Sequence, residues 1–111
     1  MILPSEIRFA DDNVKKAFYE LEKGDNLEKE LFRFISQAMD NIEENAFCGV
    51  QIPKKQIPKE YMQRYLVGNL WKYDLPNACR LIYSISGGKA VVVSIVLEWM
   101  SHKDYERRFN Y

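Results

Sequence analysis

Hydrophobic and polar positions near the start of the chain follow first the period of a strand and then the period of a helix. Residues 6–10 alternate and predict a short first strand. The run Asp11-Asp12-Asn13 offers helix N-caps, and an apolar stripe at helical spacing follows it (Val14, Ala17, Phe18 and Leu21). Gly24 ends this helix, because glycine readily takes the left-handed position after a helix C-terminus.

A second and longer helix is predicted directly after this turn. Asn26 is its expected N-cap, and Phe32 and Phe34 widen its apolar face. That face carries Leu27, Leu31, Ile35, Ala38, Met39 and Ile42. A helix of ~19 residues is ~28 Å long. The pattern therefore predicts a helical hairpin joined by a tight turn.

The middle of the chain is less regular. Residues 46–57 contain Gly49 and Pro53 and indicate a loop or an irregular sheet edge. Pro58 is typical of the first turn of a helix, and we expect a short helix that ends at Gly68. Its inward side chains are expected to be Tyr61, Met62 and Tyr65.

Three strands and a short helix are predicted for the C-terminal part. The strands span residues 70–75, 78–86 and 90–99, and Pro76-Asn77 and Gly87-Gly88 form the turns of a meander. The last strand is apolar on both faces, which is typical of a strand in the interior of a sheet. Ser101 is a suitable cap for a helical segment over residues 101–109. The whole pattern predicts one α+β domain over residues 1–111.

The register of the first hairpin in this meander decides which side chains share a face. A three-residue loop at 75–77 places Trp71 opposite Leu81 and gathers the apolar residues on one face. Lys72 then lies opposite Arg80, with Asp74 beside them, on the other face. A two-residue loop would scatter the core residues, so the pattern favours a polar cluster of these three side chains.

Length and composition fit a single globular domain. The chain has 111 residues, of which 47% are hydrophobic and 29% charged. No segment approaches the ~20 apolar residues of a membrane helix, and the start has neither a basic nor a hydrophobic leader segment. We therefore expect a cytoplasmic protein without membrane contact.

Charge is unevenly distributed although the formal net charge is zero. Residues 1–50 hold six basic and eleven acidic side chains, whereas residues 51–111 hold ten basic and five acidic ones. One interpretation is a local face that attracts anions; the other is an acidic helix pair on a mildly basic sheet. Charge alone favours neither.

The residues with metal-binding chemistry are few and widely spaced. Cys48 and Cys79 form no paired motif, and His102 is the single histidine. This spacing is a weak signal for zinc, and two reduced thiols are the default in the cytoplasm. No metal and no cofactor are expected.

The order of strand, helical hairpin and three-stranded meander resembles the RelE/ParE toxin superfamily. The most specific segments are Asn69-Leu70-Trp71-Lys72-Tyr73-Asp74-Leu75 and Cys79-Arg80-Leu81-Ile82-Tyr83. The segment Ser101-His102-Lys103-Asp104-Tyr105-Glu106 is similar to the His-x-x-Tyr segment of HigB-type members. The resemblance covers nearly the whole chain.

This resemblance implies a toxin that cleaves mRNA on the ribosome and that a cognate antitoxin holds inactive; the ParE branch instead inhibits DNA gyrase. Metal-free RNA cleavage needs a base, cations beside the phosphate and an acid. The resemblance assigns the phosphate to Arg80, a second cation to Lys72, acid or base work to His102 and an orienting role to Tyr105. Basic residues expected to contact RNA around them are Lys54, Lys55, Lys59, Arg64, Lys103, Arg107 and Arg108.

The chain also departs from the RelE pattern. Asp74 stands at the position of a second lysine, and Met100 and Glu106 stand where RelE has an arginine and a tyrosine. An exposed turn histidine and a simple cross-strand ion pair between Asp74 and Arg80 are the plain alternatives. The alternative functions are a catalytically silent or ParE-like relative that acts by protein contact, and an antitoxin-bound or homodimeric scaffold.

Overall fold

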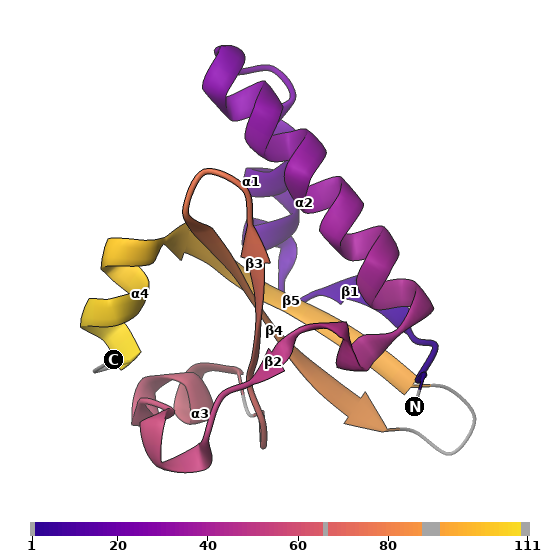
Figure 1. Ribbon diagram of the computed structural model, residues 1–111, viewed down its shortest axis with the longest axis vertical. Helices are drawn as coiled ribbons and strands as arrows, with labels where there is room; N and C mark the ends of the chain where they lie inside the picture. The colour runs from indigo at the N-terminus through magenta and orange to yellow at the C-terminus, as the bar shows by residue number, and fades with distance from the viewer. Residues whose placement is uncertain (1, 66, 88–91, 110–111) are drawn as a thin grey trace.

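The computed structural model describes residues 2–65, 67–87 and 92–109. Five strands form one sheet in the order β1-β5-β4-β3-β2, and helices lie on both of its faces (Figure 1). The predicted α+β fold class is confirmed. The strands are β1 (Glu6–Phe9), β2 (Val50–Gln51), β3 (Trp71–Leu75), β4 (Cys79–Gly87) and β5 (Val92–Ser101). The helices are α1 (Asp12–Leu21), α2 (Asn26–Glu44), α3 (Lys59–Tyr65) and α4 (His102–Phe109), with short 3₁₀ turns η1 (Ala46–Cys48) and η2 (Lys54–Gln56).

The helical hairpin α1–α2 has the predicted limits, but its second cap differs. Asp11 caps α1 by accepting a hydrogen bond from the backbone N–H of Val14 at 2.9 Å. The N-cap of α2 is Asp25, not Asn26 as predicted. Asp25 and Glu28 form a capping box, in which each side chain accepts from the other residue's backbone N–H. Asn26 has no acidic residue three positions on, which is why the cap lies one residue earlier.

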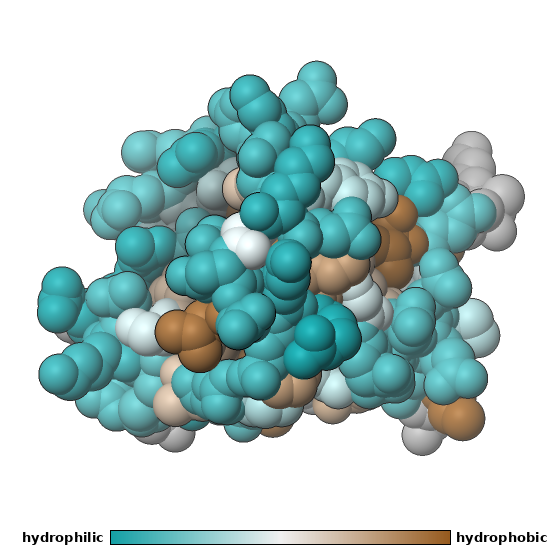
Figure 2. All heavy atoms as spheres, turned by 90° about the horizontal axis from the view of Figure 1, so that it is seen from above, coloured by the Kyte–Doolittle hydropathy of each residue, from teal (hydrophilic) through white to brown (hydrophobic). Residues whose placement is uncertain are grey.

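The hairpin covers one face of the sheet. Phe18 of α1 and Ile35 and Ile42 of α2 pack against Leu81 and Tyr83 of β4. The outer sides of these helices are polar, and Figure 2 shows a largely hydrophilic surface with small, separate hydrophobic patches when the molecule is seen from above. Burial of this amphipathic pair is what holds the hairpin against the sheet.

The opposite face of the sheet carries a second core beneath α3 and α4. Tyr61, Tyr105 and Phe109 pack there against Ile82 and Leu97. The predicted inward position of Met62 is wrong, since its side chain is 52% exposed. Tyr61 and Tyr65 lie four residues apart on one side of α3, whereas Met62 is turned by about 100° from Tyr61.

The β3–β4 hairpin has a three-residue loop, as predicted, but shifted by one residue to 76–78. Leu75 pairs with Cys79, Asp74 with Arg80 and Lys72 with Ile82, so Lys72 does not lie opposite Arg80. The loop turns through positive φ at Asn77 and Ala78. The pairing changes by two positions, so each side chain stays on its predicted face.

β5 lies between β1 and β4, as predicted for an interior strand, and runs parallel to β1. A β-bulge beside Ile82 and Tyr83 interrupts its pairing with β4. The predicted turn at Gly87-Gly88 and the predicted start of this strand at residue 90 lie partly outside the described residues. β2 pairs with β3 in the segment expected to be a loop or an irregular edge.

Candidate functional site

Lys72, Asp74, Arg80 and His102 meet on the sheet face that carries α4. Alternation along β3 and β4 places the first three on this face. His102 is the first residue of α4, and its backbone N–H donates to the carbonyl of Ala78 in the hairpin loop at 2.7 Å. The hydroxyl of Ser101 accepts from the backbone N–H of Asp104, so the predicted cap is confirmed. The loop and the cap together fix the position of His102.

Arg80 is the centre of this cluster, which we call the Arg80 cluster. Its side chain is only 15% exposed. Nη1 donates to the carbonyl of Cys79 at 3.1 Å, and Nη2 lies 2.8 Å from Nδ1 of His102. Nε lies 2.9 Å from Oδ1 of Asp74, yet among the described residues the buried Nε–H has no acceptor in hydrogen-bond geometry. Within the described part of the chain, Arg80 therefore retains a buried donor without a well-aligned acceptor.

Asp74 links the two cations of the cluster. The same Oδ1 that faces Arg80 lies 3.2 Å from Nζ of Lys72. The carboxylate is 58% exposed, whereas the side chain of Lys72 is 16% exposed. Asp74 therefore covers Lys72 and Arg80 from the solvent side and neutralises part of their charge.

His102 has a second partner that the sequence prediction did not include. Nε2 of His102 lies 2.5 Å from Oε1 of Glu106, one helical turn further along α4. Polar contacts thus run without interruption from Glu106 through His102, Arg80 and Asp74 to Lys72. The spacing of four residues within a predicted helix was the available signal for Glu106.

Tyr105 lies in the core beneath the cluster. Its side chain is 2% exposed and stacks on Phe109 at a centroid distance of 4.7 Å. Nζ of Lys72 lies 5.6 Å from the centre of the Tyr105 ring, a cation–π distance. The ring therefore supports the ammonium group of Lys72, while its burial keeps it from the surface that a substrate would reach.

Arg108, one of the predicted RNA-binding residues, is engaged elsewhere. Nη1 of Arg108 contacts Oε1 of Glu98 on β5, and the same nitrogen donates to the Tyr61 hydroxyl at 3.3 Å. The Tyr61 hydroxyl also donates to Glu98. Burial raises the pKa of Tyr61, and the hydrogen bond with Tyr61 raises the pKa of Arg108. This contact ties α4 to α3 and β5, so Arg108 is not a free cation beside Arg80.

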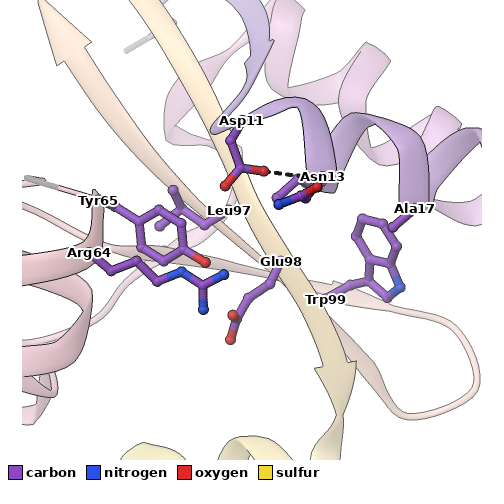
Figure 3. Close-up of a pocket in the computed structure, with 9 residues that line it drawn as sticks. Asp11, Asn13, Ala17, Arg64, Tyr65, Leu97, Glu98 and Trp99 are labelled. Atoms are coloured by element: carbon purple, nitrogen blue, oxygen red, sulfur yellow. Dashed lines mark hydrogen bonds between the residues drawn. The ribbon is translucent and has the colours of Figure 1, made fainter.

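Arg64 lies at a cleft where β5 continues past the end of β1. The cleft holds about 270 Å³, and Figure 3 shows Arg64 and Tyr65 on one side and Trp99 on the other. The guanidinium of Arg64 lies 5.2 Å from the centre of the Tyr65 ring. Burial, and then the nearby charge of Glu98, raise the pKa of Tyr65. This polar, aromatic cleft is separate from the contacts of the Arg80 cluster.

The remaining predicted RNA-binding residues are exposed and scattered over three elements. Lys54 and Lys55 lie on η2, and Lys59 begins α3. Lys103 and Arg107 lie on α4, where Arg107 is 3.9 Å from Asp104. The cluster therefore unites three of the four predicted catalytic side chains, and none of the polar contacts that link its members involves the other predicted basic residues.

The described residues hold no group of three His, Cys, Asp or Glu side chains arranged to bind a metal ion. Both cysteines are free thiols. Cys48 lies at the end of η1, and although the residue is exposed overall, partial burial of its sulfur raises the pKa of the thiol. None of the helices in the described ranges combines the length and the apolar character that crossing a membrane requires.

Comparison of the sequence with models of known protein families and with curated proteins, and of the fold with solved structures, finds no match. Function must therefore be inferred from the side chains and their geometry.

Proposed function

We propose that this chain is the toxin of a type II toxin–antitoxin pair, a RelE-like endonuclease that cleaves mRNA on the ribosome. The reaction is attack of a 2′-hydroxyl on the adjacent phosphate, promoted by side chains. Its partners are the ribosome with its mRNA and a cognate antitoxin.

The observation that carries this proposal is the buried Nε–H of Arg80, which has no aligned hydrogen-bond acceptor among the described residues. A buried donor without an aligned acceptor costs free energy, and a phosphate oxygen that displaced the Asp74 carboxylate would satisfy it. Lys72 lies on the same side of the hairpin and supplies the second positive charge. Fixed cations of this kind stabilise the charge that develops on phosphate in the transition state.

His102 supplies the proton transfer that such a site needs. Histidine is the side chain most often used for general acid–base catalysis near neutral pH. The imidazole contacts the guanidinium of Arg80, so it lies beside the position proposed for the phosphate. Tyr105 acts through Lys72, because its buried ring lies under the ammonium group.

The arrangement of elements supports the same proposal. The chain runs through a strand, a helical hairpin, an antiparallel meander β3–β4–β5 and a short helix, which is the order that the RelE/ParE resemblance implies. The cluster lies where the meander and the C-terminal helix meet.

A second candidate is a catalytically silent or ParE-like relative that acts by binding a protein. The position of Asp74 favours this alternative, because its carboxylate already contacts both cations. Such a relative would inhibit DNA gyrase or remain a scaffold for the antitoxin.

The test is induction of the wild-type chain and of Arg80→Ala, with growth and mRNA cleavage on translating ribosomes as readouts. Wild type is expected to arrest growth and cut mRNA. Arg80→Ala is expected to cut at least about 100-fold more slowly, since it removes a charge-assisted phosphate contact. Thermal unfolding checks that Arg80→Ala remains folded.

Equal cleavage by both proteins would exclude Arg80 from catalysis. Growth arrest without any cleavage, together with inhibition of gyrase supercoiling by the purified chain, would favour the ParE-like alternative.

A further inference from the structure

The contacts of His102 assign it one of the two proton-transfer roles. Resting on the proposed function, we propose that Glu106 is a positioning residue that, together with Arg80, holds His102 as a neutral imidazole with its proton on Nε2. The bare Nδ1 then faces the Arg80 cluster, and His102 acts as the general base.

The first step of the argument is the contact between Arg80 and His102. A guanidinium only donates hydrogen bonds. At 2.8 Å from Nη2 of Arg80, Nδ1 of His102 must be the acceptor, so it carries no proton. A neutral imidazole with a bare Nδ1 has its proton on Nε2.

The second step is the contact on the other side of the ring. Oε1 of Glu106 lies 2.5 Å from Nε2, so the carboxylate accepts the proton that Nε2 carries. Donor and acceptor requirements on both sides of the ring are thus met by a single tautomer. A carboxylate in this place also stabilises the imidazolium that forms when Nδ1 gains a proton.

The third step is the rigidity of the frame. His102 is fixed by its backbone hydrogen bond to Ala78 in the hairpin loop, and Ser101 caps the helix that carries both residues. Glu106 lies one turn after His102, the spacing at which two side chains of a helix meet. The ring is therefore held by a helix whose first residue is anchored to the hairpin loop.

In the reaction, the substrate phosphate accepts the hydrogen bonds of the Arg80 guanidinium, which releases Nδ1 of His102 from its contact with Arg80. Nδ1 accepts the proton of the 2′-hydroxyl as the bond from O2′ to phosphorus forms and the bond from phosphorus to O5′ breaks. The leaving 5′-oxygen takes a proton from water, and the imidazolium later returns its proton to solvent. The products are a 2′,3′-cyclic phosphate and a 5′-hydroxyl.

Nitrogen-15 NMR of the labelled full chain tests the tautomer without any substrate. The chain has a single histidine, so its imidazole signals need no assignment among several. At neutral pH we expect the proton on Nε2, with slow exchange against water. Glu106→Ala is expected to lose this slow exchange, whereas Asp104→Asn, which removes a charge from the same helix away from His102, keeps it. A proton on Nδ1, or an unchanged exchange rate in Glu106→Ala, would overturn the proposal.

Cleavage kinetics on translating ribosomes test the catalytic part. Glu106→Ala is expected to lower kcat about tenfold or more with little change in KM, because the carboxylate acts on proton transfer and not on RNA binding. Glu106→Gln, which keeps an acceptor oxygen, should recover part of the rate, and Asp104→Asn should match wild type. If wild type cleaves and Glu106→Ala has the same kcat, this inference fails and the proposed function stands. If wild type cleaves nothing, both fail.

Discussion

Asp74 sets how much uncompensated positive charge the Arg80 cluster carries. Its carboxylate contacts both Lys72 and Arg80, and more than half of it is exposed to solvent. Removing the negative charge of Asp74 leaves Lys72 and Arg80 without the carboxylate that both of them contact. Asparagine has the shape of aspartate and keeps a side-chain carbonyl that can accept a hydrogen bond from Lys72 or Arg80, so the fold should tolerate the change.

We therefore predict that Asp74→Asn raises the rate of mRNA cleavage and the affinity for RNA. The physical reason is that phosphate no longer competes with a carboxylate for Lys72 and Arg80. Single-turnover cleavage assays measure the rate, and Asp104→Asn is the control for loss of one negative charge. A slower Asp74→Asn enzyme would show instead that the carboxylate orients Arg80.

Tyr83 joins the sheet to the segment after α2 through one buried hydroxyl. The hydroxyl donates to the carbonyl of Ala46 at 2.7 Å and accepts from the backbone N–H of Gly49 at 3.1 Å. Burial raises the pKa of Tyr83 above its ordinary value. Its neutral form is therefore the one that the folded chain requires.

Tyr83→Phe should lower the free energy of unfolding by about 1–3 kcal/mol, because two backbone groups lose their partner. The raised pKa also has a pH consequence. The stabilisation is complete below the unfolded pKa of about 10 and is lost as pH rises above it. Between about pH 8 and about pH 11, the free energy of unfolding measured with urea should fall more in wild type than in Tyr83→Phe. Equal losses would contradict this assignment.

At the scale of single residues, the sequence predicted faces better than partners. Side chains alternate between the two faces of a strand, so a change of two positions in the pairing of β3 with β4 leaves every side chain on the same face. Lys72, Asp74 and Arg80 therefore lie together as predicted. Partners depend on distances of a few ångströms. Glu106 is an example, because a spacing of four residues within a helix permits its contact with His102 but does not show that the two side chains meet.

Among the elements, η1 depends on one glycine. A Cβ added at Gly49 would lie 2.5 Å from the backbone oxygen of Lys72 and 2.7 Å from the Tyr83 hydroxyl. Neither neighbour is the free end of a flexible side chain. Gly49 therefore allows the segment after α2 to lie against β3.

Gly49→Ala is predicted to lower the free energy of unfolding by about 1–3 kcal/mol, the usual cost of overpacking. Gly68→Ala is the matched control, because a Cβ there would meet no atom within 4 Å. The control should change stability by no more than about 0.5 kcal/mol. Thermal or urea unfolding measures both. Similar losses in the two variants would argue against the close contact.

Element types and the meander followed from periodicity, whereas the pairing of strands distant in the sequence did not. The amphipathic stripes predicted α1 and α2, and alternation with turn residues predicted the meander. The parallel pairing of β1 with β5 joins segments from the two ends of the chain, and no local pattern encodes such a pair. The loop at 76–78 was misplaced by one residue because Asn77 and Ala78 both adopt positive φ, and alanine gives no sign of this conformation.

Across the whole molecule, the uneven charge gives a salt-dependent prediction. Lys54→Ala with Lys55→Ala should weaken binding to a single-stranded RNA oligonucleotide and reduce the slope of log affinity against log salt by about 1.4, which is about 0.7 for each lost phosphate contact on a single strand. Lys15→Ala with Lys16→Ala removes the same charge from α1, in the acidic half of the chain, and should leave the slope unchanged. Anisotropy titrations at several salt concentrations measure both. Equal slopes in the two variants would show that Lys54 and Lys55 do not contact RNA.

The parallel pair of β1 and β5 also sets an order of events during synthesis. During synthesis from the N-terminus, β1, α1 and α2 are made well before β5, the strand with which β1 pairs. β5 supplies Val96 to one core and Leu97 to the other, so both cores remain open until it arrives. His102 and Glu106 follow β5 directly. A growing or truncated chain that ends before β5 therefore has neither a closed fold nor the histidine, and the site forms only after β5 and α4 have been added.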